Sequence, residues 1–277
     1  MLALDMRESS RTALMVAAYR GRASVAKNAI CNDPWADALA GAEGREIART
    51  YDQVYPHMEL WIAVRTAFFD DRVRRADGAA QVVLLGAGFD TRAARLARDG
   101  VRFFEVDHPD TQREKLARLA KLDGYPITHV TYVSCDFERE DFLERLGAAG
   151  FRATEPALFL WEGVTPYLTE AAVRATLRRL AEATHAESVV VFDHVRRKIV
   201  AGEAREGDLA SRAFVEGLGE PLRFGIDYPL PLLYEEGFRR VRSLTFDEVC
   251  LETTGTYDRA RAFRFQGVVL ASRAARL

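Results

Sequence analysis

The sequence is poor in cysteine, and its three cysteines, Cys31, Cys135 and Cys250, are odd in number and far apart. No C-x-x-C pair occurs, which excludes a zinc ribbon and a dithiol redox motif, and a reducing cytoplasm fits this usage best. The five histidines also lack the i, i+4 pairing of a helical metal site. We therefore expect no bound metal.

Long apolar runs and an excess of one charge are also absent. No uninterrupted apolar run approaches the ~20 residues that a membrane-spanning helix needs. The N-terminus does not resemble a signal peptide, because Asp5, Arg7 and Glu8 precede only a short apolar stretch. The 39 basic residues are balanced by 41 acidic ones, without the basic surplus that binding to nucleic acid requires. We expect a small-molecule partner; the oligomeric state stays open.

Length and composition favour one large α/β domain, since 277 residues with 48% hydrophobic and 29% charged residues are typical of globular proteins. We expect four regions along residues 1–277. They are an N-terminal helical cap (1–80), a cofactor-binding core (81–194), a helical insertion or lid (195–225) and closing strands (226–277).

Within the core, short apolar runs alternate with stretches of helical periodicity. This alternation predicts a Rossmann-like, mostly parallel sheet with helices on both faces. The strands are expected at 81–85, 101–107, 130–134, 156–162 and 188–193, with helices at 91–98, 109–122, 139–149 and 169–184. The N-terminal cap is expected to contain a helix at 60–73. A helix at 231–236 and strands at 240–246 and 263–272 follow the insertion.

The segment Gly86-Ala87-Gly88 lies between the first expected strand and its helix. Glycines there let a backbone approach a ligand closely, although a purely structural tight turn is the alternative. Asp107 ends the next strand about twenty residues later, where a carboxylate can accept both hydroxyls of a ribose. Glu105 points to the same face. The alternative for Asp107 is a cap on the helix that begins at Pro109.

Thr91 stands where a dinucleotide-binding fingerprint has its third glycine. A pyrophosphate therefore has less reason to bind here, and a nucleoside without phosphates is favoured. S-adenosylmethionine is such a ligand.

Several blocks in the right order resemble the leucine carboxyl methyltransferase family, within it the bacterial branch that includes polyketide O-methyltransferases. The blocks are Asn32-Asp33-Pro34-Trp35-Ala36, Val64-Arg65-Thr66 with Asp70-Asp71, residues 85–92, residues 104–109, Cys135-Asp136-Phe137, residues 161–169 and residues 219–225. This resemblance implies a class I methyltransferase fold with a seven-stranded sheet and S-adenosylmethionine as cofactor.

The resemblance also implies binding roles. Arg65 would hold the cofactor carboxylate, Gly86, Ala87 and Gly88 the methionine portion, Asp107 the ribose, Asp136 and the Phe137 backbone the adenine, and Glu162 the ammonium. A basic residue before Asp33 would also contact the cofactor; Arg20 is favoured over Arg22 and Lys27. The alternatives are a surface salt bridge for Arg65 and a helix N-cap before Glu138 for Asp136.

The expected activity is O-methylation of a carboxylate or phenol on a small, polyketide-like acceptor. His194 is a candidate general base for a phenol, and Tyr167 a candidate contact to the acceptor. A packed histidine and a packing aromatic are the structural alternatives. Three other functions remain open: methylation of a protein C-terminal carboxylate, a nicotinamide-dependent oxidoreductase, which Thr91 disfavours, and a non-catalytic cofactor-binding module.

Overall fold

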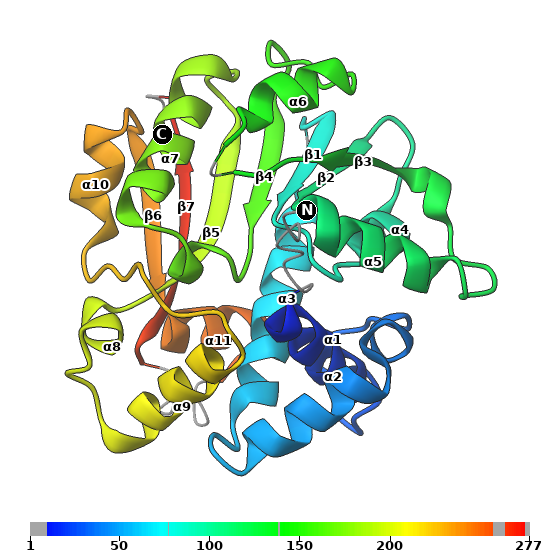
Figure 1. Cartoon of the computed structure of the whole chain (residues 1–277). Helices are drawn as coiled ribbons and strands as arrows, with labels where there is room; N and C mark the ends of the chain where they lie inside the picture. Colours follow the sequence, from blue (N-terminus) through cyan, green and yellow to red (C-terminus); the bar gives the residue numbers. More distant parts are fainter. Residues whose placement is uncertain (1–9, 77, 138, 257–263, 275–277) are drawn as a thin grey trace, which may run out of the picture.

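The N-terminal part of the chain forms three helices that pack against one another (Figure 1). The computed structural model describes residues 10–76, 78–137, 139–256 and 264–274. The helices are α1 (Arg11–Ser24), α2 (Ala36–Asp52) and α3 (Met58–Arg74). Ser10 caps α1, because its hydroxyl accepts the Ala13 N–H at 3.0 Å. The helix predicted at 60–73 is confirmed as α3.

Seven strands form one sheet in the order β3-β2-β1-β4-β5-β7-β6. They are β1 (Gln81–Leu85), β2 (Arg102–Asp107), β3 (Val130–Ser134), β4 (Ala157–Trp161), β5 (Val189–Val195), β6 (Arg240–Thr245) and β7 (Gln266–Ser272). The first five pair in parallel, and β7 pairs antiparallel with both β5 and β6. The prediction of a seven-stranded, mostly parallel Rossmann-like sheet is confirmed.

Helices cover both faces of this sheet, and the alternation along β1 shows why. Val82 and Leu84 join the apolar cluster with α1, α2 and α3, whereas Val83 and Leu85 join the cluster with α6 and α7. The core helices are α4 (Arg92–Leu96), α5 (Pro109–Leu119), α6 (Phe142–Ala148) and α7 (Glu170–Ala183), with single 3-10 turns at Ile127–His129 and Thr165–Tyr167. Burial on both faces accounts for the apolar run of β1.

Helix starts were predicted better than helix lengths. Pro109 begins α5, and Thr169 caps α7 by accepting the Ala172 N–H at 3.2 Å. The helices predicted at 91–98 and 139–149 are shorter, at Arg92–Leu96 and Phe142–Ala148. In the second case Asp141 sets the start, because its carboxylate accepts the amides of the first turn.

The insertion after β5 is helical as expected, with α8 (Arg197–Ala201) and α9 (Glu206–Gly217). It is followed by α10 (Pro229–Glu235), which begins two residues before the predicted helix. The strand predicted at 240–246 ends at Thr245, because Thr245 and Glu248 form a capping box that starts α11 (Phe246–Thr254). This helix was not predicted. The strand predicted from 263 begins at Gln266, and residue 263 lies outside the described residues.

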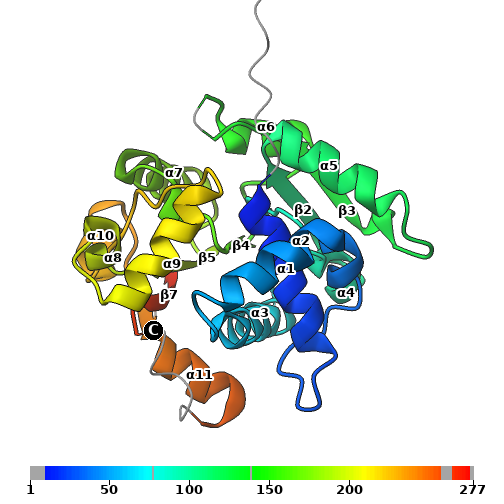
Figure 2. The same cartoon turned by 60° about the horizontal axis from the view of Figure 1, so that its bottom comes forward.

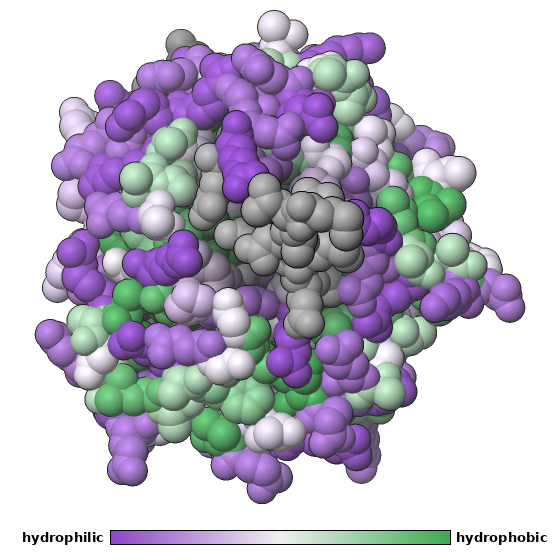
Figure 3. All heavy atoms as spheres, viewed as in Figure 1, coloured by the Kyte–Doolittle hydropathy of each residue, from purple (hydrophilic) through white to green (hydrophobic). Residues whose placement is uncertain are grey.

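The described surface is mixed in polarity, and the face in Figure 3 shows hydrophilic and hydrophobic residues interspersed. Among the helices that the structure describes, none is long and apolar enough to cross a bilayer.

Candidate functional site

A cavity of about 580 Å³ lies where the parallel strands end, at the edge of the sheet that binds ligands in open α/β folds. Its floor comes from the segments that follow β1, β2, β3 and β4. Its roof consists of the lining residues between Ser10 and Val16, at the start of α1, and between Leu218 and Arg223, after α9. In Figure 2, α1 and α9 both lie in front of the strands. The volume suits a nucleoside-sized ligand.

The glycine turn is tightly enclosed. Gly86 and Gly88 have φ angles of +68° and +51°, which favour glycine. A Cβ atom at Gly86 would lie 2.5 Å from a methyl group of Val164, and one at Gly88 would lie 3.2 Å from the Ala13 Cβ. The roof and the segment after β4 therefore approach the turn so closely that a side chain at either glycine would meet them, and both glycines line the cavity.

Asp107 lies at the end of β2 and lines the cavity. Its carboxylate accepts the Gly88 N–H at 2.5 Å and the His108 N–H at 2.7 Å, and this fixes its orientation. Burial raises the pKa of Asp107 above its ordinary value, although both amides oppose the shift. The helix cap before Pro109 is His108 rather than Asp107, because the His108 ring nitrogen accepts the Asp110 N–H.

Glu105 shares a strand face with Asp107 but belongs to a different environment. It is almost fully buried and pairs with Lys115 at 2.5 Å, and Lys115 also donates to the Asp90 carbonyl at 2.5 Å. Burial raises the pKa of Glu105 to about 7. Glu105 does not line the cavity, so this pair supports the turn from below.

Asp136 and Phe137 follow β3 and both line the cavity. The Asp136 N–H donates to Glu140 at 2.8 Å, and the Phe137 ring packs against Phe142 with centroids 5.8 Å apart. The segment is thus held in place by its own local contacts. Residue 138, named in the alternative reading of Asp136, lies outside the described residues.

Glu162 and Arg65 meet in the cavity, although they are 97 residues apart in sequence. Arg65 Nε donates to Glu162 at 2.9 Å, and the other Glu162 oxygen lies 2.7 Å from Arg92. Arg65 also pairs with Asp193 at 2.7 Å. The alternative of a surface salt bridge for Arg65 is wrong, because the side chain is 5% exposed and ion-paired on two sides.

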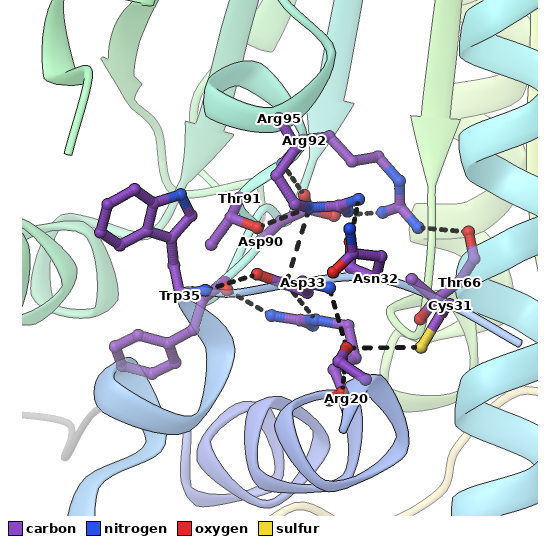
Figure 4. Close-up of polar contacts among 12 residues, drawn as sticks. Arg20, Cys31, Asn32, Asp33, Trp35, Thr66, Asp90, Thr91, Arg92 and Arg95 are labelled. Carbon is purple, nitrogen blue, oxygen red and sulfur yellow. Dashed lines mark hydrogen bonds and ion pairs between the residues drawn. The ribbon is translucent and has the colours of Figure 1, made fainter. Parts of the chain in front are cut away.

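Buried ion pairs continue beside the glycine turn, and Figure 4 shows the pair of Arg92 with Asp90. Arg92 pairs with Asp70 at 2.7 Å and with Asp90, and Arg95 pairs with Asp70 at 2.5 Å. Arg92 and Asp70 are each at most 2% exposed. An ionised group buried to this extent is tolerated only when paired, so these contacts fix the position of α4 relative to α3.

Arg20 connects the N-terminal motif to the glycine turn (Figure 4). Its guanidinium donates to Asp33 at 2.9 Å and to the Phe89 carbonyl at 2.5 Å, and Arg20 lines the cavity. Arg22 instead pairs with Asp52 at 2.6 Å, and neither Arg22 nor Lys27 is among the lining residues. Of the three basic candidates, the structure brings Arg20 to the cavity.

The two expected catalytic residues have different positions. Tyr167 lines the cavity, and burial together with the nearby Glu220 carboxylate raises its pKa. His194 does not line it and is 5% exposed, packed so closely on β7 that a Cβ at Gly267 would lie 2.6 Å from its Nε2. The structure therefore does not bring this candidate base to the cavity, because the His194 ring packs against β7.

Several residues whose roles were not predicted from the sequence join the parts of the site. Glu220, in the roof, accepts the Ser10 hydroxyl at 3.0 Å and the Thr12 N–H at 3.2 Å, so the two roof segments are tied together. Arg92 and Asp193 hold Glu162 and Arg65. Arg92 lies within the block of residues 85–92 and Asp193 ends the strand predicted at 188–193, but their partners Glu162 and Arg65 are remote in sequence and give no local pattern.

The described residues contain no cluster of side chains suited to bind a metal ion. No group of three or more His, Cys, Asp or Glu side chains suited to a metal ion occurs among residues 10–76, 78–137, 139–256 and 264–274. The acids of the cavity floor are instead engaged with backbone amides or arginines.

Comparisons with known proteins show which sequences the chain is similar to. A model of the leucine carboxyl methyltransferase family matches residues 13–181, more than half of the chain. A protein from Mycolicibacterium gilvum named "Putative S-adenosyl-L-methionine-dependent methyltransferase" is 35% identical over 246 residues, covering 82% of this chain and 77% of the relative.

Solved structures show the same fold. A DUF574 family protein from Streptomyces avermitilis aligns with a TM-score of 0.68 and 14% identity, over 98% of this chain and 100% of that chain. A structure titled as a "putative methyltransferase" from Thermobifida fusca gives 0.62 and 14%, over 97% and 96%. At such identities the likeness concerns the fold alone.

Proposed function

The chain belongs to the leucine carboxyl methyltransferase family and is an S-adenosylmethionine-dependent methyltransferase, and from this premise we propose that it methylates an oxygen atom of a small acceptor molecule. We further propose that the oxygen belongs to a carboxylate in preference to a phenol. The observation that carries this choice is the position of His194 outside the cavity.

The residues of the floor fit the cofactor. The glycine turn lines the cavity with backbone that no side chain shields, and Asp107 presents an oriented carboxylate at the end of β2. In our proposal Asp107 binds the ribose hydroxyls, and Asp136 and the Phe137 backbone bind the adenine. Arg65 and Glu162 bind the carboxylate and ammonium of the methionine portion, with Arg20 holding the turn from the N-terminal side.

Bound S-adenosylmethionine supplies an electrophilic methyl group, and the chain's task is to hold an acceptor oxygen in line with it and exclude water. Within the described lining there is one histidine, His108, and its ring nitrogen caps α5. A phenol is protonated at neutral pH and benefits from a base, whereas a carboxylate is already ionised and needs none. The lining therefore suits a carboxylate better.

The roof supports an acidic acceptor as well. Arg11 and Arg223 line the cavity there, and Tyr167 lies on its wall. An arginine offers a fork of donors that matches a carboxylate. Since Arg223 and Pro221 are exposed, we propose that a small molecule enters there. The few, widely spaced cysteines support the further proposal that the protein acts in the cytoplasm.

The chemistry of the product tests the proposal. The purified protein is incubated with methyl-labelled S-adenosylmethionine and matched aromatic acids, phenols and a peptide with a free C-terminus. We expect label in a methyl ester that mild alkali releases as methanol. A label that survives alkali, made from a phenol with a rate that rises through the histidine range of pH, contradicts the ester proposal.

The other functions considered from the sequence have less support. A peptide acceptor labelled in preference to small acids would favour methylation of a protein C-terminus. The comparisons with methyltransferases leave the nicotinamide-dependent oxidoreductase and the non-catalytic module without support.

A further inference from the structure

Arg65 is held by contacts on several sides. Its Nε donates to Glu162 at 2.9 Å and its Nη1 to Asp193 at 2.7 Å. The guanidinium lies 5.3 Å from the centre of the Trp61 ring, and a Cβ at Gly163 would be 3.3 Å from two of its nitrogens. A long, flexible side chain is thus confined to one orientation at the wall of the cavity.

Asp193 is the anchor of this arrangement. It is 2% exposed, lies on β5 and does not line the cavity, so it has no direct access to a ligand there. One carboxylate oxygen pairs with Arg65, and the other accepts the Gly163 N–H at 2.6 Å. Its backbone carbonyl accepts the Thr165 hydroxyl, also at 2.6 Å. Asp193 therefore fixes both Arg65 and the segment that carries Glu162.

The balance of charge explains why such an anchor is needed. Arg65 and Glu162 are opposite charges in contact, and without outer partners each would be neutralised by the other. Asp193 forms an ion pair with Arg65 at 2.7 Å, and Arg92 forms an ion pair with Glu162 at 2.7 Å. The four groups form an alternating row, in which the inner pair can also engage a ligand that carries one carboxylate and one ammonium.

We propose that Asp193 is a positioning residue that acts through Arg65 to set recognition of the amino-acid tail of the methyl donor. The inference rests on the proposed contact between Arg65 and the donor carboxylate. Asp193 itself touches no ligand. The chemical class that the row selects is a zwitterionic α-amino acid group attached to a nucleoside.

Ligands with and without the tail separate this role from a structural one. S-adenosylhomocysteine carries the amino-acid tail, and 5′-methylthioadenosine lacks it. We expect Asp193→Asn to lower the affinity for S-adenosylhomocysteine by about tenfold or more, as measured by calorimetric titration. The affinity for 5′-methylthioadenosine should change by less than about twofold. In turnover the variant should raise KM for the donor more than it lowers kcat.

A matched control comes from another buried carboxylate. Glu236 is 3% exposed and pairs with Arg174 and Arg178 at 2.8 Å, and it does not line the cavity. Glu236→Gln should leave the affinities of both ligands unchanged. An equal loss of affinity for both ligands in Asp193→Asn would overturn the proposal, because a general distortion of the site lowers both affinities alike.

A double-mutant cycle keeps the test decisive if Asp193→Asn folds poorly. The double variant Arg65→Gln with Asp193→Asn removes both charges of the pair and leaves no unpaired partner between them. If Asp193 acts through Arg65, the double variant binds S-adenosylhomocysteine within about twofold of Arg65→Gln alone. A further loss in the double variant overturns the proposal.

The same data show whether the premise fails instead. If the unmodified protein binds 5′-methylthioadenosine as tightly as S-adenosylhomocysteine, the tail is not recognised and the proposed role of Arg65 is wrong. If Arg65→Gln weakens S-adenosylhomocysteine but Asp193→Asn does not, Arg65 keeps its role and the inference about Asp193 is wrong.

Discussion

The floor and the roof of the cavity are built on different principles. The floor groups stand at the ends of parallel strands and are held by buried ion pairs and backbone hydrogen bonds. The roof is formed by the start of α1 and the segment after α9, which are tied to each other by hydrogen bonds from Ser10 and Thr12 to Glu220. The floor groups that we propose bind the cofactor are therefore positioned by the sheet itself, whereas the roof is built from segments outside the sheet.

Asp107→Ala gives the largest expected effect and tests the floor directly. Two charge-assisted ribose hydrogen bonds at about 1.5–3 kcal/mol each predict a loss of donor affinity of roughly 10²- to 10⁴-fold. Calorimetry measures the affinity, and circular dichroism should stay native. Asp107→Asn is the matched control with a smaller loss. Donor binding by Asp107→Ala equal to that of the parent would show that Asp107 only orients the local backbone.

Gly86→Ala should destabilise the protein through the enclosed turn. The positive φ costs about 1–2 kcal/mol for alanine, and the contact with Val164 adds about 1–3 kcal/mol of overpacking. Gly78→Ala is the control, since Gly78 also has a positive φ, +94°, but open space around it. Urea denaturation measures both. Equal losses of unfolding free energy in the two variants would mean that Val164 yields and the floor is less rigid than described.

The dependence on pH should also distinguish the floor. Burial raises the pKa of Asp107, and only the ionised form accepts from both ribose hydroxyls, so donor affinity should fall as pH is lowered through that raised pKa. Stability has the opposite sign. The folded protein keeps the Asp107 proton to higher pH than the unfolded chain, so the unfolding free energy contributed by this group decreases as pH rises through the same range. Asp107→Asn should flatten both trends.

Glu220→Gln should have a moderate effect confined to the roof. The substitution weakens charge-assisted hydrogen bonds from Ser10 and Thr12 by about 1–2 kcal/mol, so we expect KM for the acceptor to rise by about tenfold and donor affinity to change little. Steady-state kinetics and calorimetry give the two numbers. Glu216→Gln, which breaks only an ion pair with Arg212 on α9, is the control. A loss of donor affinity as large as that of acceptor affinity would erase the distinction between roof and floor.

A chelator should have the smallest effect, which is none. The acids of the floor are engaged by arginines and amides rather than by one another. Turnover with and without EDTA, before and after added Mg²⁺, measures this. Activity that disappears with chelator and returns with metal would require the floor acids to be rearranged.

The sequence predicted the floor because its residues follow strands that are visible as short apolar runs. Gly86, Asp107 and Glu162 each stand directly after such a run, and parallel strands end at one edge. His194 was misjudged for a reason of the same kind. It stands on the fifth strand as expected, but its direction depends on pairing with Gly267 of β7, and this antiparallel contact has no local signal.

The roof and the ion pairs could not be predicted, because their partners are distant. Arg65 and Asp193 are 128 residues apart, and Ser10 and Glu220 are 210 residues apart. Hydrophobic periodicity places elements but does not select partners among many arginines and acids. Helix α11 was missed for a different reason. Its Thr245 and Glu248 capping box is a local sequence signal that predicts a helix start, and it could have been recognised.

The position of β7 has a consequence for how the chain acquires its fold. β7 is the seventh strand in sequence but lies between β5 and β6, and both of its neighbours are synthesised before it. Until β7 leaves the ribosome, β6 has no strand to pair with and β5 presents an open edge to the solvent. The cavity, in contrast, is assembled from strands that are all made earlier. The strands whose ends line the cavity can therefore pair before β7 is made, and the β5–β6 end of the sheet is completed only when β7 inserts between them.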